Sequence, residues 1–144
     1  MSEMLSPHFS LAELTVSDTA RRQGLPNFPL PKHLENLRVT AHRMEAVRAI
    51  LGRPIVPTSG YRSPEVNRLV GGVANSDHAL GWAVDFAGDV HEARHLADRL
   101  DSWDQIILER AGRVIHVSFN PRNRRQTLTQ RGGPGSAIQQ GLVA

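Results

Sequence analysis

Apolar residues recur at helical spacing over one long stretch of the chain, residues 32–51. The positions are Leu34, Leu37, Ala41, Met44, Val47 and Leu51. Steps of three and four residues place side chains on one face of an α-helix. Gly52 and Pro54 follow directly, and both are typical of a helix end. The pattern therefore predicts one long helix that covers a core.

Shorter helices are predicted from their first residues. The stretches 10–14 and 89–100 each open with a capping residue that is followed three positions later by glutamate, which is the capping-box pattern. A further helix is expected at 64–69, because a proline stands at its first position. Residues 25–31, before the long helix, contain three prolines and predict a fixed, extended connector.

The pattern becomes strand-like in the second half of the chain. Residues 105–109 and 114–119 are rich in β-branched side chains, and a four-residue loop with Gly112 separates them. Two such runs around a short glycine-containing loop predict a β-hairpin.

The register of this hairpin decides which polar residues lie near His116. Pairing of Ile106 with Val117 makes the apolar faces of the two strands coincide. His116 then shares its side with Glu109. A shift by one residue would mix the two faces and bring Asp104 to that side instead. We predict the first register, with Glu109 as the nearby carboxylate and Asp104 as the alternative.

Another strand is predicted at 82–86, where large and small side chains alternate. Asp85 shares its face with the small Ala83. Gly81 breaks the local structure before this strand, so a loop that carries His78 can return to Asp85. The imidazole and the carboxylate would then converge over small residues, which leaves room for a metal ion.

His116 on the hairpin is the candidate for a third ligand. Two histidines and an aspartate with an open fourth position are the parts of a catalytic zinc site. Zinc lowers the pKa of a bound water towards about 7 and polarises a carbonyl, while a nearby carboxylate transfers protons. These parts predict amide hydrolysis. The sequence contains one HExxH, His91-Glu92-Ala93-Arg94-His95, within the predicted helix 89–100. Arg94 and Arg99 indicate that this helix face is solvated, so we do not expect the site of the helix-borne zinc proteases there.

Several short motifs occur together around these residues. They are Ser59-Gly60-Tyr61-Arg62-Ser63-Pro64, Ser76-x-His78-x-x-Gly81-x-Ala83-x-Asp85, Leu108-Glu109 and Ile115-His116-Val117-Ser118. In this combination the chain resembles the D-alanyl-D-alanine carboxypeptidase family of zinc peptidases, from Phe9 to about Phe119. It is most similar to the short phage and prophage members, which are peptidoglycan-cleaving lysis enzymes.

The resemblance implies the metal ligands and the general base. In that family the positions of His78, Asp85 and His116 bind zinc. Many members place the acid or base three residues before the last histidine, where this chain has Arg113. The short phage-type members instead carry a glutamate at the end of the preceding strand. That position matches Glu109, which is therefore the expected base.

Substrate-binding residues are expected just after a short strand at 55–59. Gly60 lets the chain turn so that Tyr61 and Arg62 face the cleft. The resemblance implies that Arg62 holds the substrate, and its guanidinium is suited to clamp a carboxylate or a carbonyl. Ser76 is expected either to orient the backbone or a ligand in the loop of the first histidine, or to serve only as a turn residue.

The composition is that of one domain with a core: 144 residues, 40% hydrophobic and 22% charged. We expect a single α+β domain, in which N-terminal helices pack on a small, mainly antiparallel sheet that carries the zinc site. It would span 1–120, with 1–31 as a helical and extended lead-in and 121–144 as a basic, Gly-rich tail. No apolar run approaches the roughly 20 residues of a membrane span.

Charge and cysteine content add limited information. The absence of cysteine excludes disulfides and thiolate ligands. The net charge is +3, and four arginines crowd the end of the chain: Arg122, Arg124, Arg125 and Arg131. We expect these arginines to be solvated, with a patch for nucleic acid or acidic wall polymers as the alternative, and we expect no nucleic acid as a partner.

The predicted function is zinc-dependent hydrolysis of an amide bond in the peptidoglycan stem peptide or cross-link, by a phage-type lysis enzyme. We expect a monomer, unless the protein is part of a virion. Residues 1–5 lack the features of a secretory signal, so we expect synthesis in the cytoplasm and action on the wall after release or from a phage particle.

The sequence leaves the bond and part of the function open. The candidate bonds are L-alanyl–D-glutamate, D-alanyl–diaminopimelate and D-alanyl-D-alanine. The alternative function is a virion- or wall-associated binding module that retains the fold and the metal site, which Arg113 and the basic tail favour. A signalling role on a related zinc fold, of the hedgehog kind, has no specific support.

Overall fold

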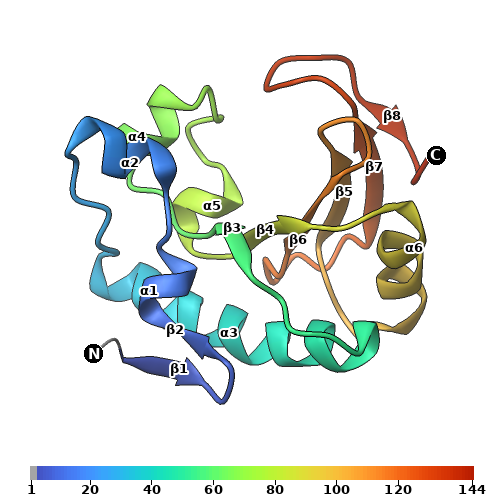
Figure 1. The fold of residues 1–144 in the computed structure, drawn as a ribbon, viewed down its shortest axis with the longest axis horizontal. Coiled ribbons are helices and arrows are strands. Elements are labelled where there is room, and N and C mark those ends of the chain that lie inside the picture. The colour runs from blue at the N-terminus through green and yellow to red at the C-terminus, as the bar shows by residue number, and fades with distance from the viewer. Residues whose placement is uncertain (1–2) are drawn as a thin grey trace.

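The computed structural model describes residues 3–144, in which helices pack against a six-stranded sheet (Figure 1). The helices are α1 (Leu11–Leu14), α2 (Asp18–Gln23), α3 (Pro31–Leu51), α4 (Pro64–Leu69), α5 (Asp77–Leu80) and α6 (Val90–Arg99). The strands are β1 (Met4–Ser6), β2 (Phe9–Ser10), β3 (Pro57–Ser59), β4 (Ala83–Ala87), β5 (Gln105–Glu109), β6 (Val114–Ser118), β7 (Gln126–Gln130) and β8 (Gln139–Gln140). The predicted single α+β domain is confirmed.

The strands of the main sheet are ordered β3-β4-β6-β5-β7-β8. Neighbouring strands run antiparallel except β5 and β7, which are parallel. β1 and β2 form a separate two-stranded sheet. The main sheet is thus mainly antiparallel, as predicted. One of its faces contributes to the hydrophobic core, and the other is the polar face on which the site lies.

α3 is the long core helix that the apolar spacing predicts. Its inward side chains have no exposed surface and pack in the same cluster as the apolar face of the sheet: Leu37, Ala41, Met44 and Val47. Gly52 ends the helix in the left-handed conformation, at φ 65°. Burial of each of the larger side chains, Leu37, Met44 and Val47, contributes roughly 1.5–3 kcal/mol. α3 therefore packs on the apolar side of the sheet, opposite the polar face (Figure 1).

The β5–β6 hairpin has the predicted register. Ile106 pairs with Val117, and this pair is fully buried in the core. Since side chains alternate along a strand, His116 and Glu109 lie on the other, polar face. The coincidence of the two apolar faces was sufficient to place both residues on the side of the candidate site.

The last part of the chain belongs to the sheet. β7 pairs along its whole length with β5, and β8 pairs with β7. The prediction of a separate basic, Gly-rich tail over 121–144 is therefore wrong for these strands. The sequence of β7, Gln-Thr-Leu-Thr-Gln, contains a single apolar side chain. It gives almost no hydrophobic pattern, and its pairing depends on a parallel partner about twenty residues away.

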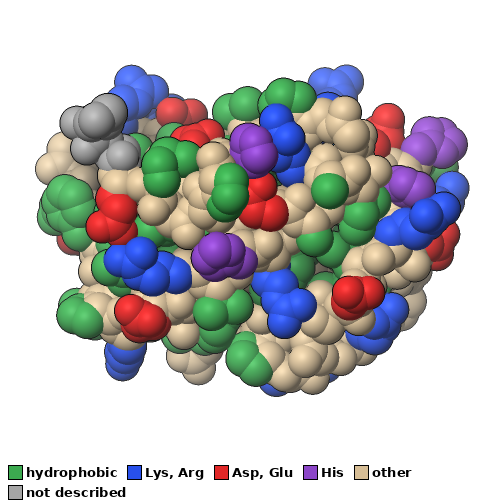
Figure 2. Space-filling view, turned by 90° about the horizontal axis from the view of Figure 1, so that it is seen from below, with side chains coloured by type: hydrophobic (Ala, Val, Ile, Leu, Met, Phe, Trp, Pro, Cys, Tyr) green, Lys and Arg blue, Asp and Glu red, His purple; other side chains and the backbone are tan. Residues whose placement is uncertain are grey.

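The surface carries charges of both signs. Figure 2 shows the face seen from below Figure 1, where basic and acidic side chains are interspersed among hydrophobic and polar ones. Within residues 3–144, no helix combines the length and the apolar character needed to span a membrane.

Candidate metal centre

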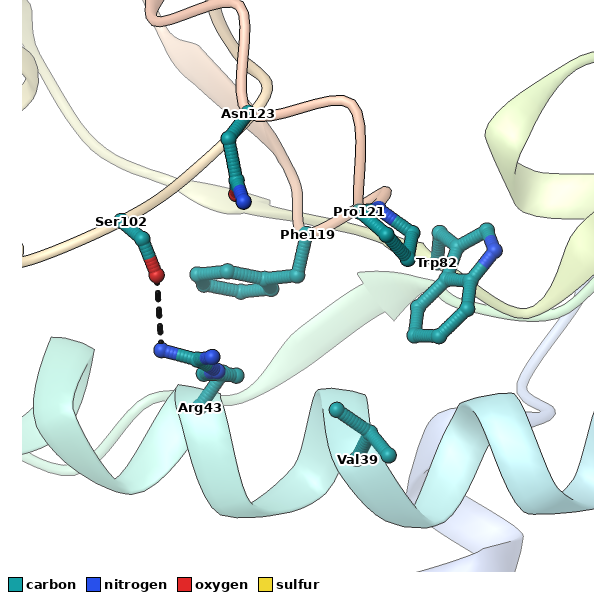
Figure 3. A pocket seen from close by; sticks show the side chains of 7 residues that line it. All are labelled: Val39, Arg43, Trp82, Ser102, Phe119, Pro121 and Asn123. Carbon is teal, nitrogen blue, oxygen red and sulfur yellow. Dashed lines mark hydrogen bonds between the residues drawn. The ribbon is translucent and has the colours of Figure 1, made fainter.

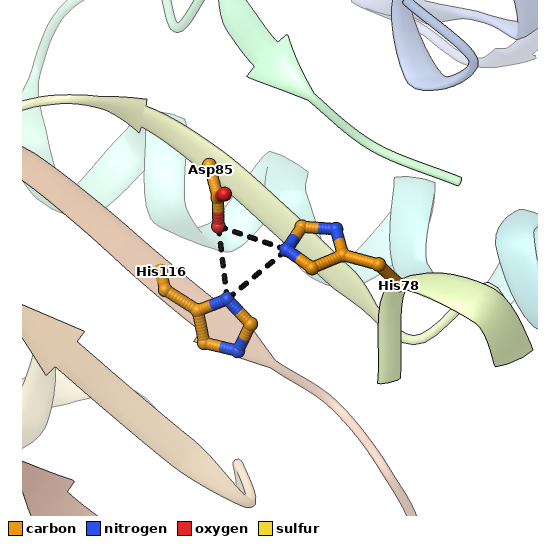
Figure 4. Close-up of side chains that lie close together, drawn as sticks. All are labelled: His78, Asp85 and His116. Atoms are coloured by element: carbon orange, nitrogen blue, oxygen red, sulfur yellow. Dashed lines mark hydrogen bonds and ion pairs between the residues drawn. The ribbon is translucent and has the colours of Figure 1, made fainter. Parts of the chain in front are cut away.

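Three polar side chains converge on the polar face of the sheet (Figure 4). His78 Nε2 lies 3.1 Å from Asp85 Oδ1, and His116 Nδ1 lies 2.9 Å from the same oxygen. The two ring nitrogens are 3.2 Å apart. Tetrahedral coordination at roughly 2.0–2.1 Å separates neighbouring ligand atoms by roughly 3.3 Å. These three residues, called the metal cluster below, therefore have the spacing of three ligands around one ion.

The sheet and a one-turn helix bring the metal cluster together. Asp85 on β4 lies directly opposite His116 on β6, so strand pairing alone makes them neighbours. His78 comes from α5, which begins after its N-cap Ser76 and ends at Gly81 with φ 86°. A Cβ at Gly81 would lie 2.6 Å from a backbone carbonyl oxygen of α3. Glycine therefore allows the turn that returns the chain from His78 to β4.

A backbone carbonyl fixes the tautomer of His78. Its Nδ1 lies 2.8 Å from the carbonyl oxygen of Gly60, and only an N–H can donate to that oxygen. In the neutral ring, Nε2 therefore presents a lone pair to the carboxylate of Asp85. Two acceptors at this distance repel each other unless a cation lies between them. The donor set, with its carbonyl-oriented histidine, thus fits a metal ion.

Gly60 is needed for this orientation. A Cβ built on Gly60 would lie 2.2 Å from the backbone oxygen of Leu14. Any other residue would push β3 away from the N-terminal segment and move the carbonyl that His78 binds. The sequence motif around Gly60 therefore has a structural explanation that is specific to the metal cluster.

Burial and charge act differently on the three groups. Burial lowers the pKa of His78 below its ordinary value, which favours the neutral, metal-binding ring. Burial alone would raise the pKa of Asp85, but the two histidines outweigh it and hold that pKa well below its usual range. For His116, burial lowers the pKa, but the hydrogen bond and charge of Asp85 outweigh it and raise the pKa. The carboxylate is therefore ionised at neutral pH.

Glu109 lies in the same cleft as the metal cluster, at the end of β5. It pairs with Val114, two residues before His116, and so stands diagonally across from that histidine. Burial raises the pKa of the Glu109 carboxyl above its ordinary value, and the charge of Asp85 raises it further. A carboxyl with a raised pKa accepts a proton more readily than an ordinary glutamate does.

Asp104, the alternative to Glu109, is engaged elsewhere. It is fully buried, and Arg124 binds both of its carboxylate oxygens, with Nε and Nη2 each at 2.9 Å. Burial alone would raise the pKa of Asp104, but the hydrogen bonds and charges of its arginine partners lower it. Of the two acids, Glu109 is the one that lines the cleft of the metal cluster.

Arg62 lines the cleft as predicted. Its backbone N–H donates to the carbonyl of His78 at 3.1 Å, which ties the two segments together. Burial lowers the pKa of its guanidinium, and the charges of Asp85 and Glu109 oppose this. Within residues 3–144, its buried Nε has no hydrogen-bond partner. A guanidinium with an unused N–H in a cleft is suited to bind a carboxylate or carbonyl of a ligand.

The two other predicted substrate-binding residues differ in outcome. Ser76 lines the cleft, but its Oγ donates to Asn67 Oδ1 at 3.0 Å and accepts a backbone N–H of α5. The prediction that Tyr61 faces the cleft is wrong, since it is 1% exposed and lies in the core. Successive side chains of an extended segment point in opposite directions, so Arg62 in the cleft directs Tyr61 to the core.

A second polar cluster, built on buried carboxylates, lies beside the first, and the sequence pattern gives no sign of it. We call it the ion-pair cluster; its members are Asp77, Asp104, Ser118, Asn120, Arg122 and Arg124. Asp77, directly before His78, accepts a hydrogen bond from Ser118, two residues after His116. The cluster therefore ties together the two elements that carry the histidines. Two of the four arginines expected to be solvated belong to it.

The cleft around the metal cluster has a volume of about 560 Å³, which is within the range of ligand sites. A smaller pocket of about 120 Å³ lies between α3 and residues 119–123 (Figure 3). There Arg43 Nη1 donates to Ser102 Oγ at 2.8 Å, beside Trp82 and Phe119. Arg43 is its single charged lining residue. The larger cleft, which contains the metal cluster, is therefore the candidate site.

An α+β domain with a histidine–aspartate–histidine cluster in a cleft, flanked by a glutamate and an arginine, has the parts of a metal-dependent hydrolase. The Peptidase M15 family matches residues 7–118. The chain belongs to this family of metallopeptidases, the D-alanyl-D-alanine carboxypeptidase-type zinc peptidases. A comparison with curated proteins gave no match. The family match includes the metal cluster, Arg62 and Glu109, and it ends before β7.

Proposed function

We propose that this protein is a zinc-dependent peptidase that hydrolyses an amide bond next to alanine in the peptidoglycan stem peptide or cross-link. The observation that carries the proposal is the convergence of three ligand atoms, with an ionised carboxylate facing the lone pair of His78. His78, Asp85 and His116 hold the ion. Bound zinc would polarise the peptide carbonyl and bring the pKa of a water to about 7.

Glu109 acts as the general base and then as the acid. It lies diagonally across from His116 in the same cleft, and burial raises the pKa of its carboxyl above the ordinary value, which favours proton uptake. It would take the proton of the attacking water and return it to the amine that leaves. The peptide bond breaks between the carbonyl carbon and that amine, and water supplies the new hydroxyl.

Arg62 positions the substrate. Its buried guanidinium has a donor without a partner among the described residues and lies near the charges of Asp85 and Glu109. A substrate carboxylate would pair with it in a bidentate geometry. All three candidate bonds carry a carboxylate on the residue that supplies the amine: glutamate, diaminopimelate or the terminal D-alanine. We further propose a phage-type lysis role, from a freely released enzyme or a virion component.

The test is mass spectrometry of muropeptides after digestion of purified peptidoglycan, with zinc-loaded protein, with a chelator, and with His116→Ala. New amino groups that disappear in both controls support the proposal, and the product masses name the bond. Unchanged muropeptides, from protein that holds one zinc, would contradict it. The binding-module alternative would then lead, and sedimentation of the protein with intact peptidoglycan would test it.

A further inference from the structure

The row of the sheet that carries Asp85 and His116 continues into aliphatic residues. His116 lies opposite Ile107 on β5, and Ile107 lies opposite Leu128 on β7. Strand spacing is roughly 4.8 Å, so Ile107 and Leu128 lie roughly 5 and 10 Å from His116 along this row. The floor of the cleft beside the metal cluster is therefore aliphatic over about the width of one or two peptide residues.

A third aliphatic residue comes from the loop 131–138, which joins β7 to β8 and which we call the arch. Ile138 is 55% exposed and lines the same cleft as Ile107 and Leu128. These three residues form the aliphatic strip. Figure 1 shows the arch facing the loop between α4 and α5. The two loops approach each other there, since a Cβ built on Gly71 would lie 3.4 Å from the Cβ of Pro134.

Carboxamide side chains lie along both sides of the strip. Gln105 Nε2 donates to Gln126 Oε1 at 2.7 Å on one side. On the other side Gln130 pairs with Glu109, and its Nε2 donates to the Ser136 carbonyl at 3.0 Å. Each carboxamide has further hydrogen-bonding positions. An aliphatic floor between amide groups suits a peptide that carries an alkyl side chain.

The strip is largely contributed by residues outside the family match. Leu128, Ile138 and Gln130 all lie after residue 118, where that match ends. The part of the chain that matches the family carries the metal cluster, whereas the C-terminal strands supply most of this wall of the cleft. Two of the three residues of the strip, Leu128 and Ile138, therefore come from the C-terminal segment, and Ile107 comes from within the family match.

We infer that the aliphatic strip is a specificity subsite for the alanine side chain on the carbonyl side of the cut bond. This rests on the proposed function. Each candidate bond has alanine on its carbonyl side and a carboxylate on its amine side. Arg62, from the β3 side of the sheet, takes the carboxylate. The strip, on the β7 side, takes the methyl group, and the two features together orient the peptide.

The test is binding of the stem pentapeptide, and of analogues with one alanine at a time replaced by glycine, to zinc-loaded Glu109→Gln protein. Calorimetry gives each affinity without turnover. Loss of one buried methyl group is expected to weaken binding about 4-fold for one analogue. When Ile138→Gln or Leu128→Gln is added, the ratio of the affinities for the pentapeptide and for that glycine analogue should fall close to 1. Leu69→Gln is the matched control, since Leu69 is 51% exposed on α4, outside the cleft.

Ile138→Gln changes an exposed side chain, so it keeps the test valid if Leu128→Gln fails to fold. A ratio that is unchanged in Ile138→Gln, or equal affinity for all peptides, or no binding of any peptide, would overturn the subsite. Muropeptide digestion by the wild-type protein is measured in parallel. If the wild-type protein does not hydrolyse peptidoglycan, the proposed function fails. The ratio of peptide affinities still shows whether the aliphatic strip binds an alanine side chain.

Discussion

The metal cluster and the ion-pair cluster are neighbours, but they accommodate buried charge in opposite ways. In the ion-pair cluster, both oxygens of Asp104 accept hydrogen bonds from arginine at 2.9–3.0 Å. In the metal cluster, one oxygen of Asp85 is approached by two imidazoles, and His78 turns a lone pair towards it. A buried charge is stable when it is paired and hydrogen-bonded. The first cluster meets this condition from its own residues, and the second would meet it with a bound cation.

This difference indicates a structural role for the ion-pair cluster and a metal-binding role for the metal cluster. Donors from Arg122 and Arg124 satisfy the buried carboxylates of the ion-pair cluster, which therefore holds α5 and β6 together. Within residues 3–144, the metal cluster is the one group of acids and histidines with the spacing of metal ligands. Removing a carboxylate should therefore affect metal binding in one cluster and folding in the other.

The largest expected effect is from Asp85→Asn. Loss of a ligand should lower zinc affinity by more than the roughly 10–100-fold that loss of an outer partner costs, and hydrolysis should fall below detection. Competition with a chromogenic chelator measures the affinity. Asp104→Asn is the matched control, because it removes the same charge from the other cluster. The comparison would fail if Asp85→Asn bound zinc as tightly as the wild type does. It would also fail if Asp104→Asn kept its fold but lost zinc affinity.

Glu109→Gln should separate proton transfer from metal binding. Turnover is expected to fall roughly 10²–10⁴-fold, as removal of a general base does, while one zinc per chain remains bound. Metal analysis and muropeptide digestion on the same preparation measure both. Normal turnover would remove Glu109 from the mechanism. Loss of zinc would instead make it a fourth ligand.

The metal cluster could be predicted from the sequence because its determinants are local. Alternation over 82–86 assigned Asp85 to the face with small side chains, and the apolar faces of the hairpin set the register of His116 and Glu109. Each of these inferences needed only neighbouring residues and a period of two. Strand pairing then made Asp85 and His116 adjacent without any further requirement.

The ion-pair cluster and β7 depend on contacts that no local pattern encodes. Arg122 and Arg124 look like a solvated run until β7 pairs in parallel with β5 and brings them to Asp104. The prediction for Tyr61 is wrong for a different reason. Tyr61 and Arg62 are adjacent in an extended segment, so their side chains point in opposite directions and only one of them can face the cleft.

Asp77→Ala tests whether the two clusters are coupled. It removes the acceptor that joins α5 to Ser118 and Arg122, so His78 should be held less firmly relative to His116. We expect zinc affinity to fall roughly 10-fold, at the low end for an outer partner, with the zinc-bound fold preserved. Asp98→Ala, which removes an exposed carboxylate on α6, is the control. Unchanged affinity in Asp77→Ala would show that the clusters are independent.

The smallest expected effect is the pH dependence of the contribution that Asp104 makes to the free energy of unfolding. Its native pKa is lowered, because hydrogen bonds and charges from Arg124 and Arg122 outweigh burial. As the pH falls, the Asp104 carboxylate is therefore protonated in the unfolded chain before it is protonated in the native protein. Its contribution to stability is present above the unfolded pKa of about 3.9 and is lost below it. The arginines are about half exposed, so we expect only about 1 kcal/mol from the charges.

Urea unfolding of zinc-free wild type and Asp104→Asn, at several pH values between 7 and 2, measures this contribution. The difference in free energy of unfolding should stay constant down to about pH 4 and then narrow. The lowered pKa of Asp85 is present in both proteins and cancels in the difference. A difference that stays constant to pH 2 would mean that Asp104 stabilises the fold through packing and neutral hydrogen bonds. The contrast between the two clusters would then rest on metal binding alone, and not on how each one neutralises its charge.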